Sequence, residues 1–183
     1  MNKEQKKRKS IFREVLSWIL YLVIVCGAGY VIVHYVGERT EVRGESMYPA
    51  LNDGDNLIVD KISYRFSDPK RFDVVVFPFQ YQEDTFYIKR IIGLPGETVQ
   101  IYEGDIYING KILNESYGNA KIENGGLASK AITLGEDEYF VLGDNRNNSA
   151  DSREPSVGNI SKSDIIGKAW MRIWPLNDIG FLK

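Results

Sequence analysis

Three short strings of the chain hold side chains that could carry out nucleophilic chemistry. The first, residues 44–49 (Gly-Glu-Ser-Met-Tyr-Pro), places Ser46 in a turn between glycine and proline. The second, residues 87–97, contains Lys89, and the third, residues 143–153, is rich in Asp, Asn, Ser and Arg. A serine hydroxyl becomes a strong nucleophile when a nearby base removes its proton, and a neutral lysine amine can be that base.

Each of these residues also has a plain structural explanation. Most serines in turns only bond to backbone groups, and most lysines in strands are exposed. Lys89 differs because a strand over residues 86–92 would place Tyr87, Lys89 and Ile91 on one face. Between two large apolar neighbours the amine would lose solvation, which lowers the pKa of a lysine. A pairing of Ser46 with Lys89 is therefore a hypothesis that the sequence permits.

The chain offers few other candidates for a base or a metal ligand. Its single histidine, His34, and its single cysteine, Cys26, both lie in the apolar run of residues 15–36. A Ser-His-Asp triad in the rest of the chain is therefore excluded, and so is an intramolecular disulfide. The shortage of His and Cys also argues against a metal site, and we expect neither a metal nor a cofactor.

Taken in order, the three strings resemble the conserved boxes of bacterial type I signal peptidases (peptidase family S26). The likeness extends from the apolar run nearly to the C-terminus, and the short domain and single anchor resemble those of Gram-positive members. The resemblance implies a membrane-bound serine endopeptidase that removes signal peptides from secreted preproteins with a Ser-Lys dyad. It implies Ser46 as the nucleophile and Lys89 as the general base.

The resemblance also implies supporting roles for residues of the second and third strings. Arg90 would form a salt bridge with Asp144, and Asp151 would form a structural ion pair with Arg153. Ser149 matches a serine that hydrogen-bonds the lysine amine and orients it. These residues would hold the site together rather than react.

Two positions depart from the family pattern. Gly44 stands where many members have a serine that helps to bind the oxyanion, so the oxyanion hole is expected to use backbone N–H groups, including that of Ser46. Asn147 stands where an Asp is frequent, which removes a charge but none of the implied reacting groups. Family substrates carry small side chains at −1 and −3, as in Ala-x-Ala, because shallow apolar pockets exclude large ones. Ile88 and the stretch around Met47 are the expected pocket walls.

A long apolar run predicts a membrane anchor. Residues 15–36 contain no Asp, Glu, Lys or Arg, and 18 of these 22 residues are apolar. A helix needs about 20 apolar residues to cross the hydrocarbon core. Residues 1–14 carry a net charge of +4, which predicts a cytoplasmic tail by the positive-inside rule. Residues 37–183 would then form an extracytoplasmic catalytic domain of a single-pass protein of the cell membrane.

A cleavable signal peptide is the alternative explanation of the apolar run. The apolar core of such a peptide is usually only about 7–15 residues long and is followed by small residues at the cleavage site. Here residues 37–40 (Gly-Glu-Arg-Thr) follow a longer run without an Ala-x-Ala pattern. A retained anchor is therefore the favoured interpretation.

From residue 37 onward the pattern predicts a mainly β domain after a single N-terminal transmembrane helix. Strands are expected where β-branched and aromatic residues gather, over 56–60, 73–79, 86–92, 98–102, 106–109, 139–142 and 169–174. A short turn is expected near residues 161–165, and residues 114–131 look like a loop or an inserted excursion. With the resemblance, this implies an all-β signal-peptidase-like domain of short, strongly bent sheets.

Charge and context limit the partners and leave two other functions open. The chain beyond the tail carries a net charge of −6, which argues against nucleic-acid binding because that needs a cationic face. The expected partners are secretory preproteins and the lipid bilayer, with the secretion translocon close by. One alternative is an inactive relative that acts in pilus or surface-protein assembly. Loss of the lysine would favour this alternative, but Lys89 is present. A self-cleaving repressor with a Ser-Lys pair is the other, and it needs an N-terminal helix-turn-helix.

Overall fold

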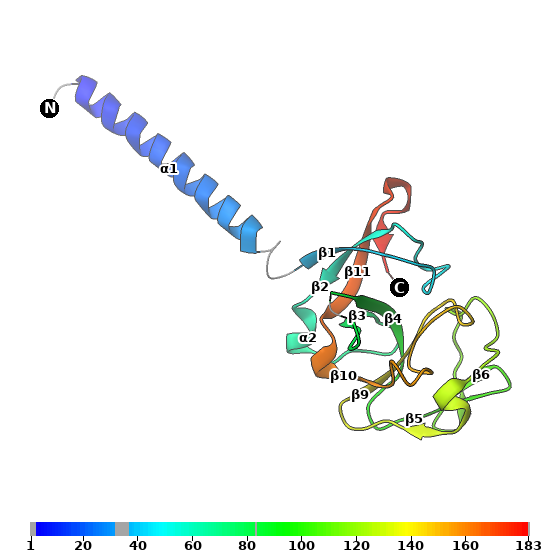
Figure 1. Cartoon of the computed structure of the whole chain (residues 1–183). Coiled ribbons are helices and arrows are strands. Elements are labelled where there is room, and N and C mark those ends of the chain that lie inside the picture. Colours follow the sequence, from blue (N-terminus) through cyan, green and yellow to red (C-terminus); the bar gives the residue numbers. More distant parts are fainter. Residues whose placement is uncertain (1–2, 32–36, 83, 183) are drawn as a thin grey trace. The chain divides into compact units, whose positions relative to one another are not determined.

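The computed structural model describes residues 3–31, 37–82 and 84–182, and the chain divides into two compact units (Figure 1). The first unit, Met1–Gly37, contains helix α1 (Lys3–Val31), and the second, Glu38–Lys183, is the body. Helix α1 begins inside the basic tail rather than at residue 15, because Lys, Glu, Gln and Arg are good helix formers. The last part of the predicted anchor, residues 32–36, lies outside the described residues.

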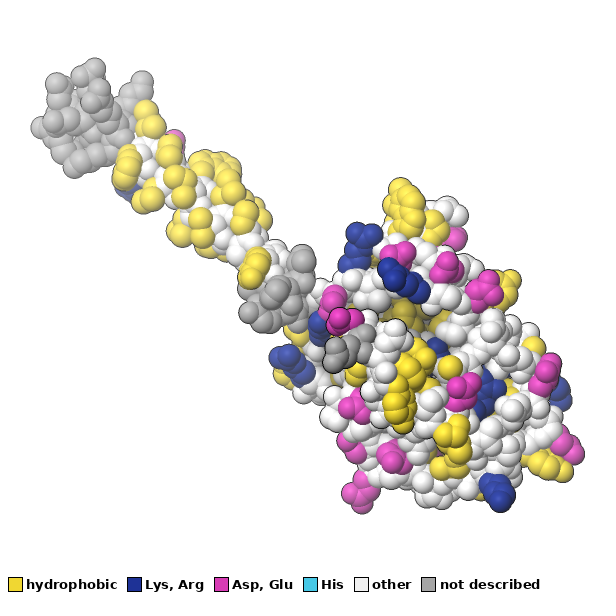
Figure 2. Space-filling view, viewed as in Figure 1, with side chains coloured by type: hydrophobic (Ala, Val, Ile, Leu, Met, Phe, Trp, Pro, Cys, Tyr) yellow, Lys and Arg dark blue, Asp and Glu magenta, His cyan; other side chains and the backbone are white. Residues whose placement is uncertain are grey.

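The described side chains of α1 are exposed, and many of them are large and apolar. Trp18 is 69% exposed and Leu22 is 61% exposed, and Figure 2 shows hydrophobic side chains along this helix. The rings of Trp18 and Tyr21 meet edge to face at 6.1 Å. Among the helices of the described residues, none combines the length and the apolar character needed to cross a membrane. The predicted membrane-spanning helix is therefore not confirmed.

The body is built on two antiparallel sheets. The larger sheet has the strand order β1-β2-β11-β3-β4-β9-β10, with β12 paired to β11. Its strands are β1 (Gly37–Glu41), β2 (Asn56–Asp60), β3 (Val74–Pro78), β4 (Phe86–Gly93), β9 (Glu138–Leu142), β10 (Ile160–Ser161), β11 (Gly167–Trp174) and β12 (Gly180–Phe181). The smaller sheet has the order β7-β6-β5-β8, and its strands are β5 (Thr98–Tyr102), β6 (Asp105–Ile108), β7 (Lys111–Ile112) and β8 (Ile132–Thr133). In Figure 1, β5 and β6 lie at the end of the body away from β1 and β2.

The predicted mainly β character is confirmed, and each predicted strand corresponds to a strand of the structure. The strands that prediction missed are β1, with the polar sequence Gly-Glu-Arg-Thr-Glu, and the two-residue strands β7, β8, β10 and β12. The remaining elements are the short helices α2 (Ser63–Phe66), η2 (Gly126–Ser129), η3 (Lys162–Asp164) and η4 (Leu176–Asp178). Residues 114–131 connect β7 to β8 and contain η2; we call this segment the excursion.

Strand β4 carries the second string through the middle of the larger sheet, between β3 and β9. Every residue from Ile88 to Gly93 is buried, because both faces of this strand are covered. Ile88 packs in a cluster with Met47, Ile91 packs in a second cluster, and Ile92 joins a third between the two sheets. The apolar side chains of β4 therefore hold its polar residues at fixed positions in the core.

Candidate active site

A tight turn presents the hydroxyl of Ser46. Gly44 has a φ of +84°, a left-handed conformation that favours glycine, and its N–H donates to Asp53 Oδ1 at 2.7 Å. Met47 is 1% exposed and packs in the apolar cluster beneath the turn. The buried methionine anchors one side of the serine and the glycine allows the chain to turn on the other, so Ser46 stays half-buried at the surface.

Lys89 reaches Ser46 from β4. Its ammonium group donates to Ser46 Oγ at 2.8 Å and to the carbonyl oxygen of Ile88 at 3.0 Å, and it lies 4.9 Å from the centre of the Tyr87 ring. The side chain is only 3% exposed. Burial lowers the pKa of Lys89 to about 8, while the charges of Asp151 and Asp144 act to raise it. A lysine in this state supplies a neutral amine near physiological pH.

The second and third strings are joined by a buried ion pair. Arg90 donates through Nε and Nη2 to the two oxygens of Asp144, at 2.8 and 2.7 Å. The two side chains are 1% and 0% exposed. Arg90 also donates to the carbonyl of Phe72, and its guanidinium lies 3.8 Å from the centre of the Tyr117 ring. The implied Arg90–Asp144 salt bridge is present as a bidentate pair next to Lys89.

Within the third string, Asp151 and Arg153 form a second bidentate pair. Arg153 Nε and Nη2 each lie 2.8 Å from a different Asp151 oxygen. Asp151 also accepts from the N–H of Gly143 at 3.1 Å, and Asp151 is completely buried. This pair therefore closes the loop that connects Gly143 to Arg153.

The implied hydrogen bond between Ser149 and Lys89 is not found. Within the described part of the chain, the buried Ser149 hydroxyl has no hydrogen-bond partner. It lies against Gly143 and near the carbonyl oxygen of Ser46, so closely that a Cβ added at Gly143 would overlap both. The Lys89 ammonium is instead engaged by Ser46 and Ile88. Ser149 thus fills the space behind the nucleophile.

Sequence reasoning missed two residues of the third string that contact the site. Asn145 donates from its backbone N–H to the Ser46 carbonyl at 3.0 Å and from Nδ2 to the Glu45 carbonyl at 3.1 Å. Arg146 is 2% exposed, forms a 2.8 Å ion pair with Glu115 and donates to the Gly143 carbonyl. Asn145 reaches a backbone carbonyl across the fold and Arg146 reaches a carboxylate in the excursion, and such long-range contacts leave no signal in residue spacing.

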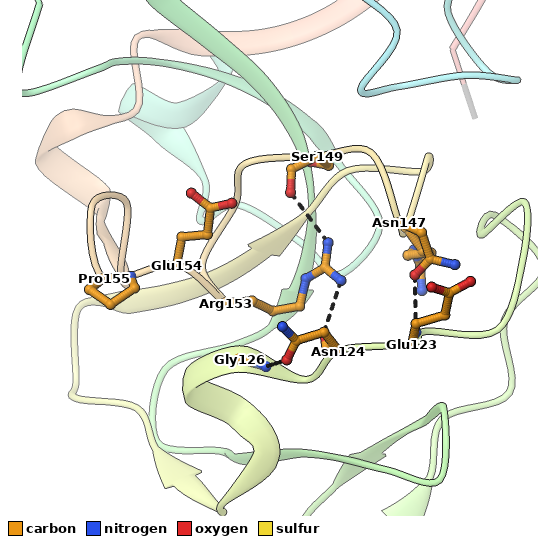
Figure 3. Close-up of a pocket in the computed structure, with 9 residues that line it drawn as sticks. Glu123, Asn124, Gly126, Asn147, Ser149, Arg153, Glu154 and Pro155 are labelled. Atoms are coloured by element: carbon orange, nitrogen blue, oxygen red, sulfur yellow. Dashed lines mark hydrogen bonds between the residues drawn. The ribbon is translucent and has the colours of Figure 1, made fainter.

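The excursion packs on the third string. Asn147, at the position where the family often has Asp, accepts from the N–H of Glu123 and donates to the carbonyl of Lys121. An aspartate could not make the second bond. Figure 3 shows the polar pocket between the two segments, of about 350 Å³; it is lined by Glu123, Asn124, Gly126, Arg146, Asn147, Ser149, Arg153, Glu154 and Pro155. In this view Arg153 extends between Ser149 and Asn124, so the ion pair of the third string also contacts the excursion.

A cleft of about 570 Å³ runs past the Ser46–Lys89 pair. Its lining includes Val42, Met47 and Ile88, with Tyr87 and Phe86 along one side. The expected pocket walls, Ile88 and Met47, therefore both line the cleft. Among the described residues, no group of three or more His, Cys, Asp or Glu side chains could hold a metal ion.

Comparison with known proteins identifies the family. Residues 15–174 match the sequence profile of the family described as signal peptidase, peptidase S26. The chain belongs to this family. A probable signal peptidase I-2 of Synechocystis is 41% identical over 156 residues, covering 81% of this chain and 68% of that one. Signal peptidase I P of Bacillus subtilis subsp. natto is 33% identical over 189 residues, covering 100% and 99%.

A crystal structure of a signal peptidase I from Enterococcus faecalis also matches, with 35% identity and a TM-score of 0.45 over 56% of this chain and 97% of that chain. The signal peptidase I class consists of serine peptidases that cleave signal peptides of secreted preproteins. The family match makes this chain an enzyme of the serine peptidase class.

Proposed function

We propose that this signal peptidase uses Ser46 as its nucleophile and Lys89 as its general base. The observation that carries the proposal is the 2.8 Å hydrogen bond between Lys89 Nζ and Ser46 Oγ, made by a lysine that is 3% exposed. With a pKa of about 8, roughly a tenth of Lys89 is neutral at pH 7, against less than about a thousandth of a solvated lysine. The base is therefore available without a histidine.

The reaction follows from this geometry. Neutral Lys89 Nζ accepts the proton of Ser46 Oγ as that oxygen attacks the scissile carbonyl carbon. Backbone N–H groups, among them that of Ser46, stabilise the oxyanion. When the intermediate collapses, the Lys89 ammonium gives its proton to the leaving amine and an ester to Ser46 remains. Lys89 then takes a proton from the water that attacks this ester and returns it to Ser46 Oγ as the ester bond breaks, which releases the signal peptide and restores both Ser46 and neutral Lys89.

The supporting residues act through position and charge. The Arg90–Asp144 pair holds β4, the strand that carries Lys89, against the third string, and the Asp151–Arg153 pair holds the loop behind Ser46. The cleft beside the dyad has apolar walls that include Met47 and Ile88. Small side chains at −1 and −3 of the substrate, as in Ala-x-Ala, fit shallow apolar pockets of this kind, and larger ones are excluded by contact with the walls.

We propose further that residues 15–36 anchor the enzyme in the cell membrane, with residues 1–14 in the cytoplasm and the body outside. The charge-free sequence of residues 15–36, the exposed apolar side chains of α1 and the basic tail support this topology. An anchored protease meets signal peptides while they are still held in the bilayer. Its substrates are then preproteins that emerge from the secretion translocon.

The test is cleavage of a purified preprotein with an Ala-x-Ala site by the full-length enzyme in detergent micelles. Ser46→Ala and Lys89→Ala should each lower kcat by at least about 10³-fold, because nucleophile and base act as one unit. Lys89→Arg should fail equally, since arginine stays protonated. A wild-type protein that binds the preprotein without cutting it would contradict the proposal and favour an inactive assembly module.

A further inference from the structure

Asn145 makes two hydrogen bonds to the backbone on either side of the nucleophile. Its N–H donates to the carbonyl of Ser46, and its side-chain Nδ2 donates to the carbonyl of Glu45. The Glu45 carbonyl and the Ser46 N–H belong to one planar trans peptide group, in which they point in opposite directions. A hydrogen bond that fixes the Glu45 carbonyl therefore also fixes the direction of the Ser46 N–H.

The neighbour of Asn145 holds the other half of the dyad. Asp144 accepts two hydrogen bonds from Arg90, the residue after Lys89, and Asn145 donates to the turn that carries Ser46. Two consecutive residues thus connect the strand of the base to the turn of the nucleophile. These contacts fix the separation of Ser46 and Lys89. A shift of about 1 Å in a reacting group can lower the rate on the order of 10²-fold.

The excursion orients the amide of Asn145. Asn119 Nδ2 donates to Asn145 Oδ1 at 3.0 Å, so the opposite end of the amide, Nδ2, faces Glu45. Asn119 also donates from its N–H to the carbonyl of Asp144 at 3.0 Å and accepts from the N–H of Arg146 at 3.1 Å. One residue of the excursion therefore contacts three consecutive residues of the third string. Asn119 itself is exposed, so its share of the effect should be smaller.

We propose that Asn145 is a positioning residue that aims the Ser46 N–H at the oxyanion, and that Asn119 holds Asn145 in that orientation. The inference rests on the proposed Ser46–Lys89 chemistry. It gives the excursion a function in catalysis, although the excursion lies outside the three strings. It also supplies an orienting contact for the backbone donor of a site that has Gly44 in place of a serine hydroxyl.

The experiment compares Asn145→Ala, Asn145→Asp and Asn119→Ala with the wild type, using kcat and KM for the preprotein and the affinity for a peptide aldehyde. An aldehyde adds to the serine and forms an oxyanion-like hemiacetal, so its affinity reports on the oxyanion hole. Asn145→Ala should lower kcat and aldehyde affinity together by about tenfold with KM within about twofold, and Asn119→Ala by about threefold. Asn145→Asp, which loses the Nδ2 donor, should be impaired at least as strongly.

The matched control is Asn124→Ala, in the same excursion. Among the described residues its side chain bonds only to the N–H of Gly126, and it meets Arg153 through its backbone carbonyl, which alanine keeps; its activity should equal that of the wild type. The double variant Asn119→Ala/Asn145→Ala should have the kcat and aldehyde affinity of Asn145→Ala, because Asn119 acts on the Ser46 N–H through the Asn145 amide. All assays are run well below the thermal unfolding midpoint of each variant, so that unfolding does not lower the measured kcat. If Asn145→Ala does not fold, Asn145→Asp and Asn119→Ala decide the question.

Two outcomes would overturn the inference: unchanged kcat and aldehyde affinity in folded Asn145 variants, or a double variant whose losses multiply. Both require a wild-type enzyme that cleaves the preprotein. A wild type that does not cleave contradicts the proposed function instead, so failure of the inference and failure of the function give different results.

Discussion

At the scale of single residues, the charge of Lys89 is the feature on which the site depends. The side chain lies in the core, where its ammonium form is poorly solvated, and burial lowers its pKa to about 8. Among the described residues, the amine contacts Ser46, the Ile88 carbonyl and the Tyr87 ring. The charges of Asp151 and Asp144 also favour the ammonium form, but burial outweighs them. The same burial that makes the amine a usable base near neutral pH should therefore destabilise the fold.

The substitution Lys89→Met tests this trade between stability and activity. The variant should be inactive, yet its free energy of unfolding at pH 7 should exceed that of the wild type by about 1–3 kcal/mol. The folded wild type binds fewer protons than the unfolded chain between pH 8 and the ordinary lysine pKa, so its stability rises with pH across that window. The advantage of Lys89→Met should shrink over the same window.

Urea unfolding of both proteins at several pH values measures this difference. A Lys89→Met protein that is less stable than the wild type at pH 7, with no change across the window, would mean that the lysine is solvated in the folded protein.

The sequence allowed some of these residue roles to be predicted and concealed others. Alternation along β4 predicted Lys89 on the face of Tyr87, and the amine does lie 4.9 Å from the centre of that ring, because strand geometry is local. The family resemblance implied a Ser149–Lys89 hydrogen bond that the structure lacks, since the hydroxyl lies against Gly143. Asn145 was overlooked because its contacts are to backbone atoms 100 residues away, and such contacts are set by the path of the loops.

At the scale of elements, the Arg90–Asp144 pair joins strand β4 to the third string. Both side chains are essentially inaccessible, and the desolvation of two buried charges is balanced only while both are present. The pair thus acts as a fixed connection between the element that carries the base and the loop that contacts the nucleophile.

Replacing Asp144 by alanine should lower the free energy of unfolding by about 3–5 kcal/mol, because the buried Arg90 guanidinium loses its counter-charge. The control is Asp68→Ala, which removes the partner of Lys162 from an exposed pair with side chains 36% and 81% exposed, and which should lower the free energy of unfolding far less because water solvates the charge that remains. Chemical unfolding at pH 7 compares the two. Equal costs for both substitutions would contradict the connecting role of the buried pair.

Element boundaries were predictable where a strand is long enough to have a pattern. Strands β2 and β5 match the expected ranges. Each is five residues long and contains buried apolar side chains, which is enough for a pattern to be visible in the sequence. The two-residue strands β7, β8, β10 and β12 are too short for any periodicity. They form because their neighbours in the sheet offer hydrogen-bond partners, which is a property of the tertiary structure.

At the scale of the whole molecule, the apolar run and the basic tail predict where the enzyme works. In intact spheroplasts, protease added from outside should digest the body and leave residues 1–14 protected, because six Lys and Arg side chains in the tail favour the cytoplasmic side. An epitope at each terminus reports the two fragments. If the body were protected and the tail digested, the topology would be the reverse of the proposed one, and the enzyme could not cleave exported preproteins.

The most direct test of the Ser46–Lys89 mechanism is the pH dependence of kcat/KM for preprotein cleavage, because it reports the ionisation of the free enzyme. Lys89 must be neutral to act, and its pKa is lowered to about 8. We predict that kcat/KM rises through an apparent pKa near 8 and stays level into the mildly alkaline range. A rise near the pKa of a solvated lysine, about 10.4, would contradict the account, and a profile that stays flat into acidic pH would point to a carboxylate base such as Asp144 or Asp151.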